Sequence, residues 1–416
     1  MENTKFKGSR TFVKILDRLI HHFENNLIQF QDIYYDGKII ETKQQLNNLF
    51  LNSKMDMSIT KKLKRIESMI LNKIHPLRKA RLEKIQKIIL KGVGHELEIK
   101  SFSRLLAIKE AKALMKYIHK FTEVDYFSLY KLLFNTPGLL LKLSEGLELP
   151  KDIMQMVLET TKNLNKAFVN YEDCAPLLYV KLKLSGNLEF SDIQQVVIDE
   201  AQDYYPLQYE VFNLLFARAK FTVLGDFNQT LEKHGDKSIY DDIEIILHKK
   251  KSIKLFMNKS FRSSMEINTF TQKILNSKEE FVSFERHESE PQIIFKDCEE
   301  LLCDVIARDI KNYESRGYES IAVICKTEKE TLEVQKKLTD LYNIKFINID
   351  DTDVIKGTLV IPTYISKGLE FDVVLVYNVS KDNYKSEFDK NLLYVACTRA
   401  LHQLAIYYTG EKSEFI

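Results

Sequence analysis

The sequence predicts an α/β protein in which a long helical part precedes a parallel sheet covered by helices. Residues 1–170 carry hydrophobic stripes at helical spacing and few β-branched runs, as amphipathic helices do. From about residue 186 onward, short apolar runs alternate with helical stretches, a pattern typical of the parallel sheets of α/β folds. The turn Thr136–Gly138 punctuates the helical part, and Pro176 and the turn residues around Gly186 mark its end.

A strongly basic stretch lies between Lys61 and Lys91, where eleven Lys or Arg residues are accompanied by only two acids. Apolar residues such as Leu63 and Ile66 recur at helical spacing, which predicts one or two basic amphipathic helices. Such helices contact DNA or RNA phosphates or an acidic protein surface, and a solvated helical face explains the same pattern. The cations interpreted as contact residues are Lys61, Lys62, Lys64, Arg65, Arg78, Lys79 and Arg81.

Two carboxylates follow the apolar run Gln195–Ile198, a β-branched segment of the kind that forms a buried parallel strand. Asp199 and Glu200 would lie at the carboxyl end of this strand, where α/β sheets bind ligands. There Asp199 can hold Mg²⁺, directly or through water, and Glu200 can orient or deprotonate an attacking water. Acidic residues after a strand also serve as helix N-caps, so the two carboxylates indicate a site only in combination with further motifs.

Four further segments with polar side chains follow later in the chain. The first comes after a second apolar run, Phe221–Leu224, and its Gln229 can sense a terminal phosphate. Arg262 in the next segment is available to the same phosphate, and the last segment is expected to open a helix. The four segments are Gly225–Gln229, Asn258–Ser263, Ser366–Asp372 and Leu393–Ala400.

In this order the segments resemble motifs II to VI of superfamily 1 helicases of the UvrD/Rep group, over roughly residues 190 to 410. The resemblance implies an α/β, RecA-like P-loop NTPase fold with a partial first domain, a complete second domain and a large N-terminal helical insertion. It also implies ATP and Mg²⁺ as cofactors, and movement along DNA or RNA when a second domain closes and supplies arginines to the transferring phosphoryl group. The implied catalytic residues are Asp199, which is also the metal ligand, Glu200, Gln229, Arg262 and Arg399, and the implied nucleotide-binding residues are Gln202, Asp226, Lys367, Gly368 and Glu370.

One departure from the UvrD pattern indicates which branch of the helicase group the chain resembles. Tyr364 stands where motif V of the UvrD type carries a His, and Pro362 precedes it. These residues look more like the HelD branch, the motor proteins that release stalled bacterial RNA polymerase. Phe6–Arg10, followed by an apolar stripe from Phe12 to Ile20, is similar to the segment that opens the HelD-type helical insertion. The resemblance therefore implies RNA polymerase as a partner of residues from about 10 to 170.

The 416 residues contain no P-loop. That loop reads Gly-x-x-x-x-Gly-Lys-Ser/Thr, because its backbone N–H groups cradle the phosphates, its Lys neutralises them and its hydroxyl binds Mg²⁺. The Gly-Lys pair Gly37-Lys38 is followed by Ile39, and Asp32 stands where the first Gly should be. The chain is therefore expected to be the C-terminal part of a longer motor, active only with a separate P-loop-bearing chain. The alternatives are a non-enzymatic module that binds RNA polymerase or nucleic acid, and an inactive truncated remnant.

Three regions are expected along the chain. Residues 1–185 would form the helical insertion, residues 186–250 the remnant of the first RecA-like domain, and residues 251–416 the second RecA-like domain. The last region is expected to contain strands at Gln292–Phe295, Ile321–Cys325, Thr358–Ile361, Val373–Tyr377 and Gln403–Tyr408.

The composition of the chain bears on nucleic-acid binding, on the state of the cysteines and on location. The net charge of +2 gives no overall basic signature for nucleic acid. The five cysteines include no Cys-x-x-Cys pair, and several lie in apolar runs, so buried reduced thiols are expected. Because the chain has neither an apolar run of about 18 residues nor a signal peptide, no membrane contact and a cytoplasmic location are expected.

Overall fold

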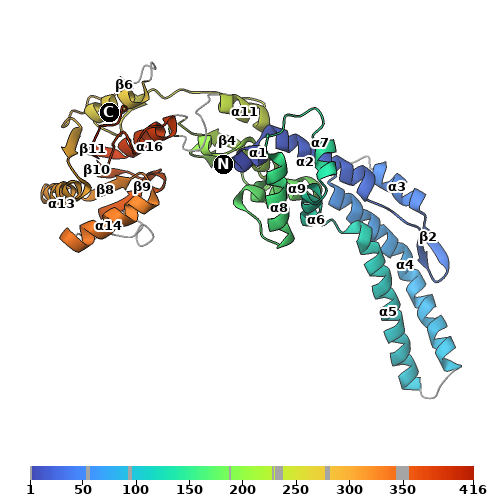
Figure 1. The fold of residues 1–416 in the computed structure, drawn as a ribbon. Coiled ribbons are helices and arrows are strands. Elements are labelled where there is room, and N and C mark those ends of the chain that lie inside the picture. Colours follow the sequence, from blue (N-terminus) through green and yellow to red (C-terminus); the bar gives the residue numbers. More distant parts are fainter. Residues whose placement is uncertain are drawn as a thin grey trace. The chain divides into compact units, whose positions relative to one another are not determined.

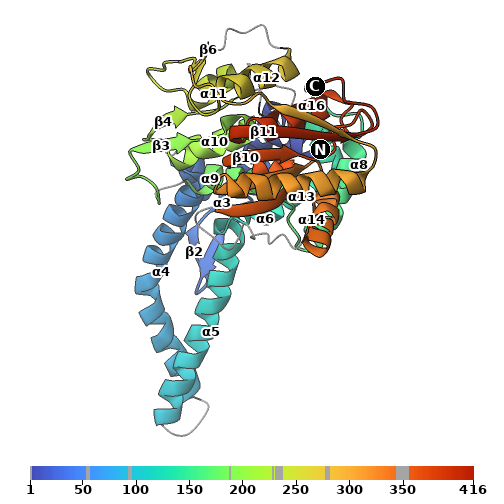
Figure 2. The same cartoon turned by 90° about the vertical axis from the view of Figure 1, so that its left-hand side faces the viewer.

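The computed structural model describes residues 2–52, 57–91, 96–186, 189–226, 229, 238–276, 282–342 and 356–416. The chain divides into two compact units. Unit 1 comprises Met1–Leu224 and Ser238–Lys250, and unit 2 comprises Gly225–Lys237 and Lys251–Ile416. Figures 1 and 2 show the elements of each unit, coloured along the sequence.

Most of unit 1 is helical, as the periodicity of residues 1–170 predicts. The apolar stripe that begins at Phe12 belongs to α2, and Phe12, Ile15, Leu16 and Leu19 are fully buried in the helical core. The described helical elements are α1 (Glu2–Gly8), α2 (Arg10–His22), the π-helix η1 (Phe23–Leu27), α3 (Lys43–Leu51), α4 (Ile59–Leu90), α5 (Glu96–Thr122), α6 (Tyr126–Asn135), α7 (Pro137–Leu143), α8 (Ile153–Asn165) and α9 (Tyr171–Ser185).

The segment Phe6–Arg10 fastens the start of the chain to the rest of unit 1. Phe6 joins the core, and Gly8 lies so close to Tyr205 that a Cβ atom would come within 2.5 Å of its side chain. Ser9 caps α2 by accepting a hydrogen bond from the Phe12 amide at 3.1 Å. Arg10 forms an ion pair with Asp242 at 3.1 Å.

Lys7, the remaining residue of this segment, carries a buried charge. Its side chain is 1% exposed, and its Nζ lies 2.6 Å from Oδ1 of Asp173, which is 0% exposed. Lys7 also donates to the Thr160 hydroxyl at 2.9 Å, and the Tyr130 hydroxyl donates to Asp173 at 2.7 Å. The network ties α1 to α6, α8 and α9, and burial raises the pKa of Tyr130 well above its usual value.

Two long helices, α4 and α5, run side by side as a hairpin that extends from the other helices of unit 1 (Figures 1 and 2). A small antiparallel β-hairpin, β1 (Ile33–Tyr35) and β2 (Lys38–Glu41), packs against them. Its turn is Asp36-Gly37, both with positive φ, as a two-residue hairpin turn requires. The expectation of helix alone is wrong here, and the Gly37-Lys38 pair belongs to this hairpin. Arg81 of α4 holds the turn by an ion pair with Asp36 at 2.8 Å.

The rest of unit 1 is a short sheet with its own core. The predicted strands appear as β3 (Gln195–Ile198) and β4 (Lys220–Val223), which pair in parallel. The 3₁₀-helix η2 (Ala201–Asp203) and α10 (Pro206–Leu215) follow β3, and α11 (Ser238–Leu247) completes the layer. Leu207 of α10 packs in the helical core, whereas Tyr209 packs in the core beside the sheet. The helix α10 therefore joins the two parts of unit 1.

Unit 2 is built on a parallel five-stranded sheet of order β7-β11-β10-β8-β9, which confirms the predicted α/β fold and its strands. Alternate residues of β8 face opposite sides. Ile321 and Val323 pack in the core with α13 and α14, and Ala322 and Ile324 in the core with α12 and α16. The elements are β5 (Lys259–Ser260), α12 (Met265–Leu275), β6 (Val282–Ser283), β7 (Gln292–Lys296), α13 (Glu299–Ser315), β8 (Ser320–Cys325), α14 (Glu328–Tyr342), β9 (Gly357–Pro362), α15 (Thr363–Ser366), β10 (Phe371–Val376), α16 (Glu387–Cys397) and β11 (Ala400–Thr409).

Three expectations need correction. Pro176 does not mark the end of the helical part, because it lies buried inside α9, whose C-cap is Gly186. The segment Leu393–Ala400 closes α16 and does not open a helix. Cys303, Cys325 and Cys397 are buried and unpaired as expected, but Cys174 is exposed. Among the described helices, none is both long and apolar enough to cross a membrane.

Candidate nucleotide site

The carboxylates of the first predicted motif lie in unit 1, directly after β3. Asp199 is exposed, and its Oδ1 accepts a hydrogen bond from the Glu200 amide at 2.8 Å. Glu200 adopts φ 51°, a left-handed conformation that is uncommon outside glycine and is found where the surrounding structure enforces it. The buried Gln202 donates to Glu200 Oε2 at 2.5 Å. The three predicted residues thus form one local group at the carboxyl end of the strand.

Three other predicted residues, in unit 2, contact the side chain or backbone of Gln229. The Gln229 Nε2 donates to Asp226 Oδ2 at 3.0 Å, and Arg399 donates to Gln229 Oε1 at 2.5 Å. Lys367 donates to the Gln229 carbonyl oxygen at 3.0 Å. Gln229 and Arg399 are 170 residues apart in the sequence, so only the fold brings them together.

Arg399 is the largest fully buried side chain among the described residues, at 1% exposure. It follows the C-cap of α16 and precedes β11, and its Nε donates to the Val395 carbonyl oxygen at 3.1 Å. Thr398 accepts a further hydrogen bond from the guanidinium at 3.2 Å. Burial, followed by the charge of Asp226, raises the pKa of the neighbouring Tyr394. A guanidinium stays charged even when it is buried, so Arg399 can attract an anionic group at this position.

Arg262 and Glu370 form a separate pair in unit 2, with Arg262 Nη2 2.5 Å from Glu370 Oε1. Both side chains are part-exposed, at 39% and 46%, so the pair contributes little to stability. Gly368, two residues earlier, has φ +81°, which suits the turn between α15 and β10. The Phe371 amide, next to Glu370, donates to the Arg399 carbonyl oxygen at 3.0 Å. The pair therefore lies close to the Gln229 and Arg399 group.

Arg286 helps to hold the candidate site together, and the sequence motifs do not identify it. Its guanidinium donates to the backbone carbonyl oxygens of Arg262 at 2.7 Å and Leu401 at 2.5 Å. The Ser263 hydroxyl reinforces this junction by donating to the Ala400 carbonyl oxygen at 2.6 Å. Arg286 thus holds the Arg262 segment against the Arg399 segment. It lies in a loop outside the predicted motifs, so neither spacing nor periodicity could have identified it.

Beside Arg286, two carboxylates organise the same loop. Glu266 accepts a hydrogen bond from the Glu288 amide at 2.9 Å and faces His287 Nδ1 at 2.8 Å, while Glu288 faces His402 Nδ1 at 2.7 Å. The amide of Glu288, above all, lowers the pKa of Glu266 to about 2. Folding therefore favours the ionised Glu266 carboxylate.

We expect Glu266→Gln to change the acid stability of unit 2. The carboxylate contributes stability that is fully present above its unfolded pKa of 4.5 and is lost as the pH falls through about 2. The variant should therefore be less stable than wild type at neutral pH, and the two should converge in acid. The measurement is the free energy of unfolding across that pH range, with the exposed Glu285→Gln as control. A difference that stays constant down to pH about 2 would contradict this account.

The basic residues predicted to contact nucleic acid or polymerase lie on α4, and the structure separates them into two groups. Lys62 pairs with Glu24 at 3.3 Å, and Arg81 pairs with Asp36 and Glu110, each at 2.8 Å. The charges of Lys62 and Arg81 are therefore paired with carboxylates of the same chain. Over the described ranges, no ion pair involves the other five, which are Lys61, Lys64, Arg65, Arg78 and Lys79.

The carboxylates at this position fit Mg²⁺ only if water and substrate phosphates supply most of its ligands. Within the residues that the structure describes, no group of three or more His, Cys, Asp or Glu side chains could hold a metal ion. Mg²⁺ commonly binds one or two carboxylates and completes its shell with water and substrate phosphates, and the exposed Asp199 suits that role. ATP, when bound, would supply those phosphates. The 416 residues contain no Gly-x-x-x-x-Gly-Lys-Ser/Thr sequence.

Comparison with known proteins identifies two family matches. Residues 10–231, more than half of the chain, match the UvrD/REP helicase N-terminal domain, and residues 358–407 match the UvrD-like helicase C-terminal domain. The solved C-terminal domain of a possible DNA helicase from Lactobacillus plantarum WCFS1 is 28% identical, with 38% of this chain and 91% of that chain covered and a TM-score of 0.33. The PRRSV helicase is 17% identical over 52% of this chain and 35% of that chain, with a TM-score of 0.28. No curated protein matches the chain.

Proposed function

Because the chain belongs to the UvrD/REP helicase family, we propose that it carries the water-activating carboxylate and the phosphate-sensing arginines of an ATP-driven nucleic-acid motor. In this proposal Glu200 orients or deprotonates the attacking water, and Asp199 is the protein ligand of Mg²⁺. Gln229, Arg262 and Arg399 act on the terminal phosphate, and Gln202, Asp226, Lys367, Gly368 and Glu370 complete the nucleotide site.

The observation that carries the proposal is the contact of Arg399 with Gln229, together with Asp226 and Lys367. A buried arginine with a side-chain amide as partner can exchange that amide for a phosphoryl oxygen without losing its backbone contacts. Arg262 can make the same exchange from Glu370, at the cost of a weak surface pair. Two arginines then stabilise the charge that develops on the transferring phosphoryl group.

ATP hydrolysis would require a P-loop that these 416 residues do not contain. Phosphoryl transfer depends almost entirely on positioning and electrostatics, so the missing Lys and hydroxyl remove contacts that the remaining residues cannot replace. We therefore propose that a separate P-loop-bearing chain completes the site. The chain by itself is expected to hydrolyse ATP very slowly or not at all.

We further propose that the motor is of the HelD type and acts on RNA polymerase. Pro362 and Tyr364 in motif V support this assignment, as does the similarity of the segment Phe6–Arg10 to the one that opens the HelD-type insertion. The basic surface of the α4–α5 hairpin favours a second candidate, a non-enzymatic module that binds polymerase or nucleic acid. The two candidates differ in one respect: the motor needs Glu200 for ATP hydrolysis, and the binding module does not.

The test is affinity capture of the tagged chain from extract of its native cells, with co-purifying polypeptides identified by mass spectrometry. A P-loop-bearing chain in the eluate, with RNA polymerase subunits, is the expected result. Polymerase without any P-loop-bearing chain would favour the binding module. If the purified chain alone showed Mg²⁺-dependent turnover that Glu200→Gln abolishes, the need for a separate P-loop would be refuted.

A further inference from the structure

The loop 284–288 lies against the segment that carries Arg262. The first amide of this loop donates to the Ser260 carbonyl oxygen at 3.0 Å, two residues before Arg262. Three residues after Arg262, the Met265 amide donates to a carbonyl oxygen of the loop at 2.9 Å. Backbone hydrogen bonds therefore fasten the loop to the Arg262 segment on both sides of the arginine.

Arg286, in the middle of the loop, reaches from the Arg262 segment to the Arg399 segment. Its Nη2 donates to the Arg262 carbonyl oxygen at 2.7 Å and to the Leu401 carbonyl oxygen at 2.5 Å. Leu401 lies two residues after Arg399, at the start of β11. One nitrogen atom thus joins the main chains of two segments that are far apart in the sequence, and hydrogen bonds from a charged donor are stronger than neutral ones.

Glu288 adds a second contact between the loop and β11. Its Oε1 lies 2.7 Å from His402 Nδ1 and 3.4 Å from Arg286 Nε. The carboxylate therefore orients the guanidinium and ties the loop to the strand at the same point. The side chains of Glu288 and Arg286 are 19% and 33% exposed, so solvent screens this ion pair less than it screens a fully exposed one.

We propose that the loop 284–288 sets the spacing between Arg262 and Arg399, with Arg286 as the positioning residue. This role rests on the proposed function, in which both arginines act on one terminal phosphate. Arg399 is buried, whereas the side chain of Arg262 is 39% exposed and pairs with Glu370 near the surface. The main chain that Arg286 holds therefore determines where the Arg262 guanidinium can reach. A misplacement of about 1 Å in such a group can lower a rate by about 10²-fold.

A purely structural role for Arg286 is the alternative. In that case its loss would destabilise unit 2 and lower activity whether or not Arg262 is present. The positioning role predicts a different result, because the effect of Arg286 on catalysis passes through Arg262. Removing Arg286 should then have no further effect in a chain that already lacks the Arg262 side chain.

The first measurement uses the full chain without partner or nucleotide. Cleavage after Arg262 by an arginine-specific protease requires this segment to open, because Ser263 and Ser264 are buried. Arg286→Met keeps an apolar stem but removes the donors, so cleavage after Arg262, quantified by mass spectrometry, should become roughly tenfold faster or more. Arg286→Lys should stay near the wild-type rate, because an ammonium can donate to the same two carbonyl oxygens. An unchanged rate in Arg286→Met would overturn the proposal.

The second measurement is the Mg²⁺-dependent ATPase activity of the complex captured by the tagged full chain. Arg286→Met is expected to lower kcat by roughly 10- to 100-fold, while the KM for ATP changes little, and Arg286→Lys should restore most of the loss. In the Arg262→Ala background the same Arg286→Met change should alter kcat by less than about twofold. Losses that multiply in the double variant would mean a structural role and would refute positioning.

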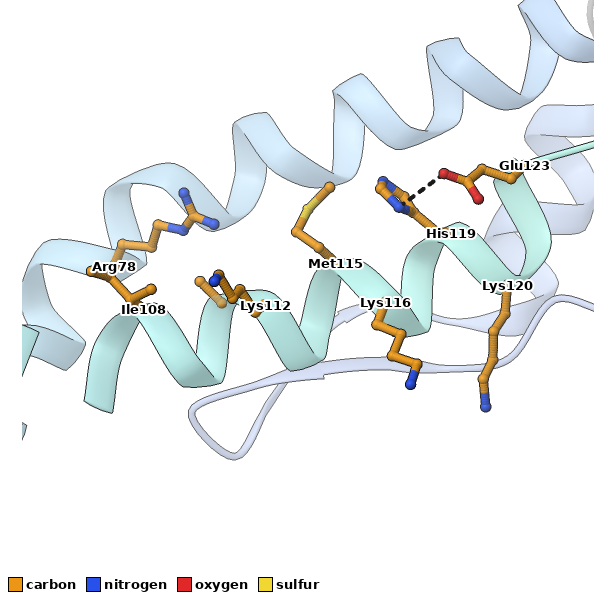
Figure 3. A pocket seen from close by; sticks show the side chains of 9 residues that line it. Arg78, Ile108, Lys112, Met115, Lys116, His119, Lys120 and Glu123 are labelled. Atoms are coloured by element: carbon orange, nitrogen blue, oxygen red, sulfur yellow. Dashed lines mark ion pairs between the residues drawn. The ribbon is translucent and has the colours of Figure 1, made fainter. Parts of the chain in front are cut away.

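A matched control comes from a histidine and carboxylate pair in unit 1. Figure 3 shows this pair on α5, where His119 Nδ1 lies 3.1 Å from Glu123 Oε1. Glu123→Gln should leave both readouts unchanged, whereas Glu288→Gln should reproduce the Arg286→Met effects by a smaller factor. Absent turnover, or turnover that is independent of Arg262, would reject the proposed function and the positioning role with it. Turnover that depends on Arg262 but not on Arg286 would reject the positioning role alone.

Discussion

If the proposed P-loop-bearing partner completes the site, replacing Arg399 by Ala is expected to lower kcat for ATP hydrolysis of the reconstituted complex by about 10³-fold. The guanidinium is buried and held by Val395, Thr398 and Gln229, so in the proposed role it would meet the phosphoryl group preorganised and without further ordering. Because its contribution arises mainly in the transition state, the KM for ATP should change much less than kcat. Steady-state kinetics of the reconstituted complex measure both.

Folding and chemistry must be separated in this experiment, since Arg399 is fully buried. Gln229→Ala removes the partner of Arg399 at a less buried position and should also lower kcat, although by a smaller factor. Arg308→Ala serves as the control, because its side chain is 74% exposed on α13. A folded Arg399→Ala variant that keeps kcat within a factor of about ten would remove Arg399 from the catalytic set.

Replacing Lys7 by Met is expected to destabilise unit 1 by about 3 to 5 kcal/mol. The change leaves Asp173 with an uncompensated charge at 0% exposure, and in the described structure its Oδ2 already lacks a hydrogen-bond partner. The loss should appear as a lower urea midpoint for the unfolding of the helical part, followed by circular dichroism.

The double variant Lys7→Met, Asp173→Leu tests the origin of this loss. If the cost comes from a stranded charge, removing both partners should recover much of the stability, because apolar replacements of a buried pair are often tolerated. Lys5→Met, an exposed position of the same helix, should be nearly neutral. A single variant within about 1 kcal/mol of wild type would show that the Lys7 and Asp173 pair contributes little.

Local sequence patterns predicted the elements of this fold well where one signal dominates. The strands of unit 2 are continuous apolar runs, and the stripe of α2 has a clear helical period, so both were identified. The β1–β2 hairpin is absent from the predicted elements although Asp36-Gly37 is a strong turn signal, because the prediction for residues 1–170 rests on helical periodicity and uses Gly37 only in the comparison of Gly37-Lys38 with a P-loop. The segment Leu393–Ala400 is predicted to open a helix although it ends α16, because the sequence around Arg399 carries no C-cap glycine or proline.

The candidate site shows a different limit. Sequence motifs identify residues whose side chains can take part in catalysis or binding. The hydrogen-bond or ion-pair partner of each one, however, is set by contacts between distant segments. Gln229 with Arg399, and Arg262 with Glu370, are pairs of this kind, and the role of Arg286 depends on two backbone carbonyl groups that no pattern marks. Likewise, charge counting on α4 could not show that Lys62 and Arg81 are neutralised within the chain.

The most direct measurement is the Mg²⁺-dependent ATPase rate of the complex captured from native extract by the tagged chain, with wild-type protein and with Glu200→Gln. The proposed role of Glu200 as the residue that activates water predicts turnover with wild type and its near-complete loss in the variant, with the same partners captured in both. An ATPase rate unchanged by Glu200→Gln would contradict the assignment of this chain as the catalytic part of the motor.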